Sequence, residues 1–235
     1  MVAYYGNYTI IISKINQLVI TVMNSVDAGI GQLVAENNKK KIWETFWELM
    51  AMRYFIAGVM VFTLYLLMNP FICVWLGDQY LLPDTVLILL LITVFITQTR
   101  GVVDIFNHAY GQYNDVWAAW TEGGINITVT VIAASFWGIS GILLGKIVSL
   151  IPIIVIWKPY YLFRDGFNIK VRSYWINVIR YLLIFFLCFI VFVLLGKSIP
   201  IIPSHGYGKL ILYALCTVVP FSITYFILLY LFSQG

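Results

Sequence analysis

The sequence predicts an all-α protein, a polytopic bundle of about seven transmembrane helices. Hydrophobic residues make up 62% of the 235 residues, charged residues make up only 10%, and the mean hydropathy is +0.93. Soluble domains carry roughly 25% charged residues, so this composition is that of an integral membrane protein. The apolar residues are grouped in stretches close to the roughly 20 residues that an α-helix needs to cross the hydrocarbon core.

The charged and sulfur-containing residues exclude several other classes. The net charge of +4 is small and dispersed. No basic run alternates with aromatic residues as a nucleic-acid groove requires, so we expect no nucleic-acid partner. The cysteines, Cys73, Cys188 and Cys216, are odd in number and lack CxxC spacing. We therefore expect no disulfide framework, no metal site and no cofactor.

The first predicted span, about residues 8–33, is the most polar of the set. Its polar residues are Lys14, Asn16, Gln17, Asn24, Ser25 and Asp27. A helix that faces lipid cannot hold so many polar groups without partners, so we expect this span to be largely buried. A short basic loop at residues 36–41 follows it.

The second predicted span covers about residues 47–68. Asn69 and Pro70 are expected to end it, because proline interrupts a helix. Residues 71–80 then form an apolar connector at the outer interface. Arg53 lies about two turns into this span, near the inner interface, where we expect a structural ion pair or a side chain that reaches water.

The third predicted span, residues 84–109, is the one around which we expect the bundle to be organised. Pro83 and Asp84 form a helix-start signal, and the apolar half of the span is followed by three ionisable residues on one helix face, Arg100, Asp104 and His108. Ionisable groups inside a bilayer are costly unless they pair or line water, and by default they mark a pathway. The alternative is that these three residues lie at the cytoplasmic interface and their side chains reach water.

The remaining predicted spans cover about residues 117–136, 139–161, 175–195 and 210–232. In the fifth span, three small residues recur every four positions and predict a close contact between two helices: Gly141, Gly145 and Ser149. Pro152 is expected to kink the same span. Together the spans form one predicted transmembrane domain over residues 1–235.

Two signals predict the topology. The loops after the first and fifth spans, residues 36–41 and 158–173, hold Lys39, Lys40, Lys41, Lys158, Arg164, Lys170 and Arg172, whereas the other side holds Lys197 and Lys209. Cytoplasmic loops carry an excess of lysine and arginine, so the basic side is predicted to be cytoplasmic and the N-terminus external. The tryptophans fall at the ends of the spans, as in the aromatic belts of membrane proteins.

Three segments carry a family resemblance: YGNYTIIISKINQLVITVMNSVDAGIGQLVAENNKKK, NPFICVWLGDQYLL and FWGISGILLGKIVSLIPIIVIWKPYYLF. In this order they resemble the C-terminal half of bacterial polysaccharide, or O-antigen, flippases, which belong to the MATE-like multidrug/oligosaccharidyl-lipid/polysaccharide exporter superfamily. The resemblance covers essentially the whole chain, but its motifs are short: YGxY, WLG and a GxxG turn. It implies one lobe of a two-lobed exporter fold, with the N-terminal lobe missing from this sequence or supplied by a partner chain.

The resemblance implies transport and not enzymatic chemistry. Such flippases move undecaprenyl-pyrophosphate-linked oligosaccharide across the bacterial inner (plasma) membrane for the biosynthesis of surface polysaccharide and lipopolysaccharide. The implied partners are this lipid-linked oligosaccharide, membrane lipid and other polysaccharide assembly proteins. No catalytic residue is expected.

The same resemblance implies a cationic cavity for the diphosphate. The candidate substrate-binding residues are Lys14, Arg100 and Lys146, and the candidates for an ion pair or for a coupling ion are Asp27 and Asp104. We expect Lys14 near the outer surface and Arg100 deeper in the membrane, so that the pyrophosphate passes from Arg100 to Lys14.

Two other classes stay open at the level of the sequence. A multidrug cation antiporter driven by protons or sodium shares the architecture but needs a mainly acidic cavity. A membrane-embedded glycosyltransferase or acyltransferase needs clustered carboxylates or a His–Asp pair, and the chain offers Asp104 and His108 for the latter.

Overall fold

The computed structural model describes residues 2–113 and 115–233, and within these ranges it contains helices and no strand, which confirms the all-α class. The long helices are α1 (Val2–Ala35), α2 (Lys39–Trp75), α3 (Asp84–Ala109), α4 (Val116–Trp137), α7 (Arg172–Lys197) and α8 (Tyr207–Ser233). Between α4 and α7 lies a continuous rod made of α5 (Ile139–Leu150), the π-helical segment η2 (Ile151–Trp157), α6 (Lys158–Tyr161) and the π-helical segment η3 (Leu162–Gly166). A short 3-10 helix, η1 (Asp78–Tyr80), precedes α3.

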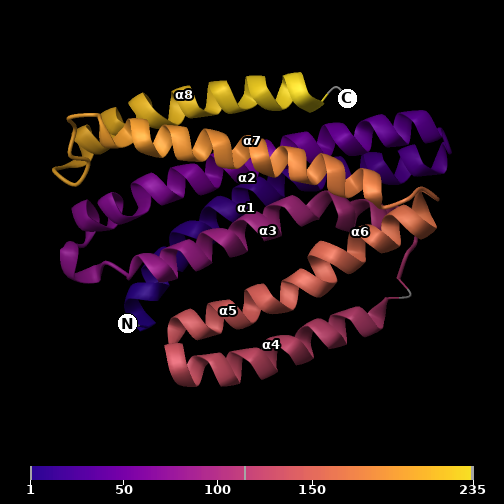
Figure 1. Ribbon diagram of the computed structural model, residues 1–235, viewed down its shortest axis with the longest axis horizontal. Helices are drawn as coiled ribbons and strands as arrows, with labels where there is room; N and C mark the ends of the chain where they lie inside the picture. Colours follow the sequence, from indigo (N-terminus) through magenta and orange to yellow (C-terminus); the bar gives the residue numbers. More distant parts are fainter. Residues whose placement is uncertain (1, 114, 234–235) are drawn as a thin grey trace.

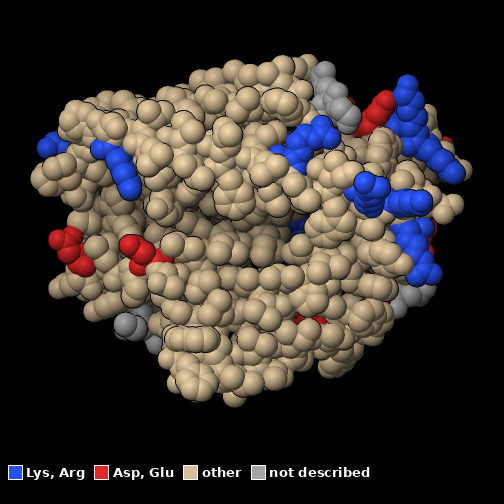
Figure 2. All heavy atoms as spheres, viewed as in Figure 1, with Lys and Arg blue, Asp and Glu red and all other residues tan. Residues whose placement is uncertain are grey.

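The long helices lie lengthwise, and successive helices run in opposite directions (Figure 1). Helices α7 and α8 form one side of the bundle and the α4–α5 hairpin forms the other, with α2 and α3 between them and α1 behind. The α1–α2 turn and the α3–α4 and α6–α7 connections meet at one end, where most of the lysine and arginine side chains in view are gathered (Figure 2). We call this the basic end. The N-terminus lies at the opposite end and the C-terminus toward the basic end.

Five helical segments of the described chain are long and apolar enough to cross a membrane: α2, α3, the rod Ile139–Gly166, α7 and α8. The chain is therefore a membrane protein. Helices α1 and α4 are not among these five, so the predicted count of about seven spans is not confirmed. Helix α4 carries Glu122 and Asn126 within its length, and these polar groups lower its hydrophobicity.

Helix α3 is the central element, as its sequence pattern predicts. Its bounds, Asp84–Ala109, coincide with the predicted ones, and it contacts α1, α2, α5 and α6. In its most apolar segment 56% of the residues are buried, compared with 22% to 44% in the other four candidate spans. Helix α3 is therefore the most buried of the candidate spans and packs against four other helices.

Helix α2 is longer than predicted at both ends. It begins at Lys39, capped by the Asn38 side chain, and it continues through Pro70 to Trp75. The prediction that Asn69 and Pro70 end the helix is therefore wrong. The extension is stabilised by packing, because Ile72 beyond the proline is fully buried.

The rod after α4 also differs from the predicted loop at residues 158–173. Pro152 lies at the second position of the π-helical segment η2, where its missing amide and its ring disturb the α-helical hydrogen bonds. The helical path nevertheless continues to Gly166, because Leu162 and Phe163 are fully buried against the core. The connection to α7 therefore shortens to residues 167–171.

The small residues of α5 make the predicted close helix contact, and the partner is α4. A Cβ atom on Gly145 would lie 2.8 Å from the Thr130 backbone, and one on Gly141 would lie 2.6 Å from the Ala134 amide nitrogen. Ser149 is buried in the same helix. Without side chains at these glycines the two backbones approach closely, which is the packing mode expected in a membrane.

Candidate functional site

A chain of polar side chains joins α1, α2 and α3 inside the bundle. Arg53 of α2 is only 7% exposed, and its Nη1 donates a hydrogen bond to Gln98 Oε1 across 3.3 Å. Gln98 Nε2 in turn donates to Asn16 Oδ1 of α1 across 2.6 Å. Gln98 is buried in the face that α3 turns toward α1 and α2. We call Arg53, Gln98 and Asn16 the interior network.

Helix α3 makes room for the guanidinium group at Gly101. A Cβ atom at this position would lie 3.0 Å from both Cζ and Nη2 of Arg53. Gln98 and Gly101 are three residues apart and therefore share a helix face. One face of α3 thus supplies a hydrogen-bond acceptor and a flat backbone surface for the same cation.

A second face of α3 carries an ion pair. Arg100 Nε lies 3.4 Å from Asp104 Oδ2, one helical turn away, and the two side chains are 35% and 27% exposed. Both groups are therefore accessible from outside the helix bundle. An arginine in this setting can exchange its carboxylate partner for another anion, such as a phosphate group.

A third polar contact ties the basic end together. Lys158 Nζ of α6 lies 2.8 Å from Asp115 Oδ2, with the two side chains 20% and 8% exposed. Asn107 of α3 donates from Nδ2 to the Lys158 carbonyl oxygen across 3.4 Å. The Lys158–Asp115 ion pair holds Asp115, directly before α4, against α6. It lies toward the same end of the bundle as the Arg100–Asp104 pair.

The predicted substrate-binding residues lie on three different helices. Lys14 and Lys146 are both exposed, on α1 and α5 respectively, whereas Arg100 is paired with Asp104. The expectation that the first span is largely buried is also wrong, because Ser13, Lys14, Gln17 and Thr21 are exposed. Helix α1 contacts α2 and α3, and much of its remaining surface is uncovered in this chain.

The predicted order of depth, with Lys14 nearer the outer end than Arg100, agrees with the structure, but the difference is smaller than predicted. The bond from Gln98 to Asn16 sets α1 and α3 in register, and the two helices run in the same direction (Figure 1). Lys14 precedes Asn16 by two residues and Arg100 follows Gln98 by two, so the two cations differ by only about 6 Å along the helices. Two residues also turn a helix by about 200°, so both side chains point away from the α1–α3 contact.

The remaining predicted residues have different outcomes. Asp27 lies within α1, but its side chain is outside the described part of the structure. His108 is exposed and its ring stacks on Tyr113 with the centroids 5.7 Å apart. The ion pair of Asp104 is with Arg100, and among the described residues no hydrogen bond joins it to His108, as an acyltransferase site would need.

The position of Arg53 in the interior network was not predicted from the sequence. The predicted start of α2 at residue 47 is wrong, because the helix begins at Lys39. Arg53 is then 14 residues, or about 21 Å, from the start of the helix. The signal that could have located it is Asn38, which is a good N-cap directly before the basic run.

Comparison of the chain with protein-family models, with curated proteins and with solved structures gives no match. The fold and the polar groups define a helical membrane protein whose central helix carries an arginine contact on its inner face and an ion pair on its outer face. The resemblance to flippases is therefore a resemblance of sequence segments alone.

Proposed function

We propose that this chain is one lobe of a transporter that moves undecaprenyl-pyrophosphate-linked oligosaccharide from the inner to the outer leaflet of a bacterial inner membrane. The observation that supports this most directly is the position of Arg100 and Asp104 on α3. They form a partly exposed ion pair in the most buried of the candidate membrane spans. Ionisable groups at such a position are costly in lipid and mark a pathway for polar solutes.

The chemistry of this pair suits an anionic substrate. A guanidinium group binds phosphate oxygens through two parallel hydrogen bonds, whereas a lysine acts as a point charge. In the absence of substrate Asp104 compensates the charge of Arg100, and a pyrophosphate group that reaches the pair takes its place. Gln98, the acceptor of the interior network, is two residues from Arg100 and so lies on the opposite side of α3, away from this exchange.

The exposed face of α1 supports a cavity next to this chain. Ser13, Gln17 and Thr21 are exposed and recur every four residues, so they form one polar stripe, with Lys14 beside it. The Ser13 and Thr21 hydroxyls donate to carbonyl oxygens within α1, so it is Gln17 and the neighbouring Lys14 that favour water or the second lobe of a two-lobed transporter over lipid tails at this face. The oligosaccharide, which is hydrated, would pass along this side while its lipid tail stays in the membrane.

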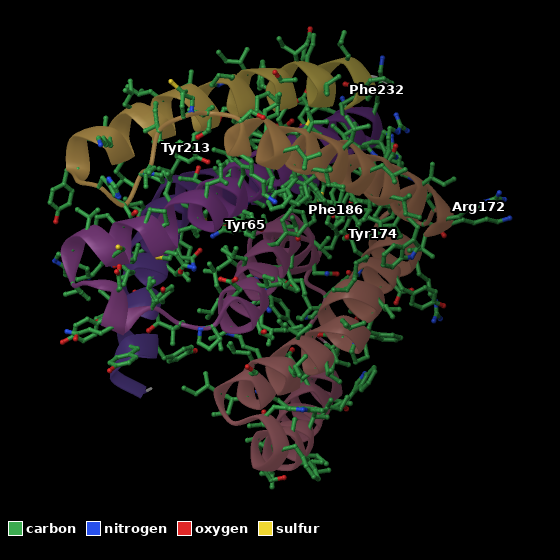
Figure 3. All side chains as sticks on the ribbon, turned by 60° about the vertical axis from the view of Figure 1, so that its left-hand side comes forward. Tyr65, Arg172, Tyr174, Phe186, Tyr213 and Phe232 are labelled. Atoms are coloured by element: carbon green, nitrogen blue, oxygen red, sulfur yellow. The ribbon has the colours of Figure 1, made fainter. Side chains whose placement is uncertain are left out.

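The test is surface glycan production in the source bacterium after deletion of the gene. Deletion is expected to remove the surface polysaccharide, and the wild-type gene is expected to restore it. Arg100→Gln removes the charge that contacts pyrophosphate, and we expect transport to be about 10 to 100 times slower. Arg172→Gln is the matched control, because Arg172 lies at the basic end of α7 and points away from the bundle (Figure 3).

Protein amounts in the membrane are measured for every variant. Normal surface glycan from Arg100→Gln at normal protein amounts would contradict the role of Arg100. Normal surface glycan in the deletion strain would contradict the proposed function as a whole.

A further inference from the structure

Two neighbouring pockets lie at the basic end, between the start of α4, the η2–α6 part of the rod and the start of α7. The larger, of about 530 Å³, is an aromatic groove defined by Trp117, Pro152, Ile156, Trp157 and Trp175. The smaller, of about 290 Å³, is a cationic pocket defined by Arg164, Asn168 and Lys170. Tyr160 and Val171 line both pockets, so the apolar groove and the cationic pocket adjoin each other.

The walls of the aromatic groove are held in place by ring contacts. The ring centroids of Trp157 and Trp117 lie 4.9 Å apart in an edge-to-face arrangement, and the ring of Trp157 stacks on that of Tyr161 with the centroids 5.8 Å apart. Trp117 is 49% exposed and Ile156 is 51% exposed, so the groove opens toward the surroundings of the bundle. Such a groove on a membrane protein can accept an acyl chain, because its lining is apolar and its mouth is open.

The cationic pocket carries two exposed cations next to this groove. Arg164 Nε pairs with Asp165 Oδ1 across 3.2 Å, but its side chain is 63% exposed, and its Cζ lies 6.0 Å from the centre of the Tyr160 ring. Lys170 is exposed in the short connection before α7. At the first turn of α7, Arg172 points away from the bundle and Tyr174 turns inward, so the connection lies at the surface (Figure 3). The positive charge therefore exceeds the negative charge at the mouth of the groove.

We propose that the two pockets together form a binding site for one anionic phospholipid. An acyl chain lies in the aromatic groove, and the phosphate group is bound by Arg164 and Lys170. The arrangement matches the layers of a bilayer, because the tryptophans occur at helix ends, where amphipathic rings prefer the interface, and basic side chains next to them attract anionic headgroups. The site uses none of the residues assigned above to the transported substrate, so it is independent of the proposed function.

Native mass spectrometry of the purified full chain tests this site. The protein in detergent is titrated with dioleoylphosphatidylglycerol or, separately, with dioleoylphosphatidylcholine. We expect one phosphatidylglycerol to be retained about tenfold more strongly than phosphatidylcholine, since each basic residue near the surface favours an anionic lipid. The double variant Arg164→Gln/Lys170→Gln is expected to lose this preference. The control Lys39→Gln/Lys40→Gln removes the same charge from the same end of the molecule and is expected to keep it.

A second pair of variants tests the groove. Ile156→Trp fills the groove and is expected to reduce retention of both lipids, whereas Ile176→Trp, at a position of α7 that is 52% exposed and outside the groove, is expected to leave it unchanged. Glycerol phosphate in excess is expected not to displace the lipid, because it lacks the acyl chains. Equal retention of the two lipids by the wild type, or an unchanged preference in Arg164→Gln/Lys170→Gln, would overturn the proposal. So would displacement by glycerol phosphate, which would indicate a site for free phosphate.

Discussion

Arg53 and Gln98 join α2 to α3 through a hydrogen bond of 3.3 Å in the interior of the bundle. The same Gln98 amide donates to Asn16 across 2.6 Å, so one side chain connects three helices. Buried polar groups are tolerated when each has a partner, and losing a partner costs roughly 1 to 3 kcal/mol. Gln98 is therefore the residue on which the packing of α1, α2 and α3 depends most directly.

The first prediction is that Gln98→Leu destabilises the bundle. The change removes the acceptor of Arg53 Nη1 and the donor to Asn16 Oδ1, so we expect the free energy of unfolding to fall by about 1 to 3 kcal/mol. The measurement is the thermal unfolding midpoint of the protein in detergent. Gln79→Leu, at an exposed position of η1, is the control and is expected to change little. An equal midpoint for Gln98→Leu and the wild type would show that the network does not stabilise the fold.

The second prediction concerns the contact between α4 and α5. In Gly145→Leu, even the Cβ atom of the new side chain would lie 2.8 Å from the Thr130 backbone, so the two helices must separate. We expect a lower yield in the membrane and a lower unfolding midpoint. Gly124→Leu is the matched control, because a Cβ atom at Gly124 has no neighbour within 4 Å. If both variants behave like the wild type, the close approach of these helices has no role in stability.

The sequence predicted the parts of the fold that depend on local signals. The bounds of α3 agree with prediction because Pro83 and Asp84 mark its start and Gly111, with φ of +66°, follows its end. The stripe of small residues in α5 predicted the close contact because only small side chains allow it, although its partner, α4, was not predicted. The end of α2 could not be predicted in this way, since burial of Ile72 outweighs the local effect of Pro70.

The candidate site was predicted less well, and the reason is geometric. Sequence spacing placed Arg100 and Asp104 on one face of α3, where they form an ion pair. The relative depth of Lys14 and Arg100 depends on how α1 and α3 are aligned, and this alignment is set by the contact between Asn16 and Gln98 from two distant parts of the chain. The number of residues from a predicted helix end cannot supply that alignment.

The third prediction is the orientation of the basic end. Cysteines are introduced singly at Lys40 and Ser204, after Cys73 and Cys216 have been replaced by serine. Lys40 is suitable because its side chain is 86% exposed. A membrane-impermeant maleimide is expected to label Ser204→Cys in intact cells and Lys40→Cys only after lysis, because lysine and arginine accumulate on the cytoplasmic side. The reverse pattern would place the basic end outside the cell and contradict the orientation used for transport.

The fourth prediction concerns the contact between α2 and α8. Tyr225 of α8 is fully buried and its hydroxyl donates to the Tyr54 carbonyl oxygen across 3.0 Å. Gly58 lies beneath the ring, where a Cβ atom would be 2.9 Å from Tyr225 Cζ. Gly58→Ala is therefore expected to lower the unfolding midpoint in detergent, whereas Gly123→Ala, with open space around its Cβ position, is expected not to do so. A midpoint unchanged in Gly58→Ala would mean that α8 is not packed tightly on α2.

The proposed transport of lipid-linked oligosaccharide to the outer leaflet is most directly tested by the distribution of this lipid between the two leaflets in spheroplasts. A membrane-impermeant reagent that oxidises sugars modifies only the oligosaccharide of the outer leaflet, and lysis then exposes the remainder. With the gene present, we predict modification before lysis, and after deletion we predict that almost all modification requires lysis. Restoration by the wild-type gene and not by Arg100→Gln would connect this distribution to the pair on α3. An unchanged distribution in the deletion strain would contradict the proposal that this chain moves the lipid-linked oligosaccharide.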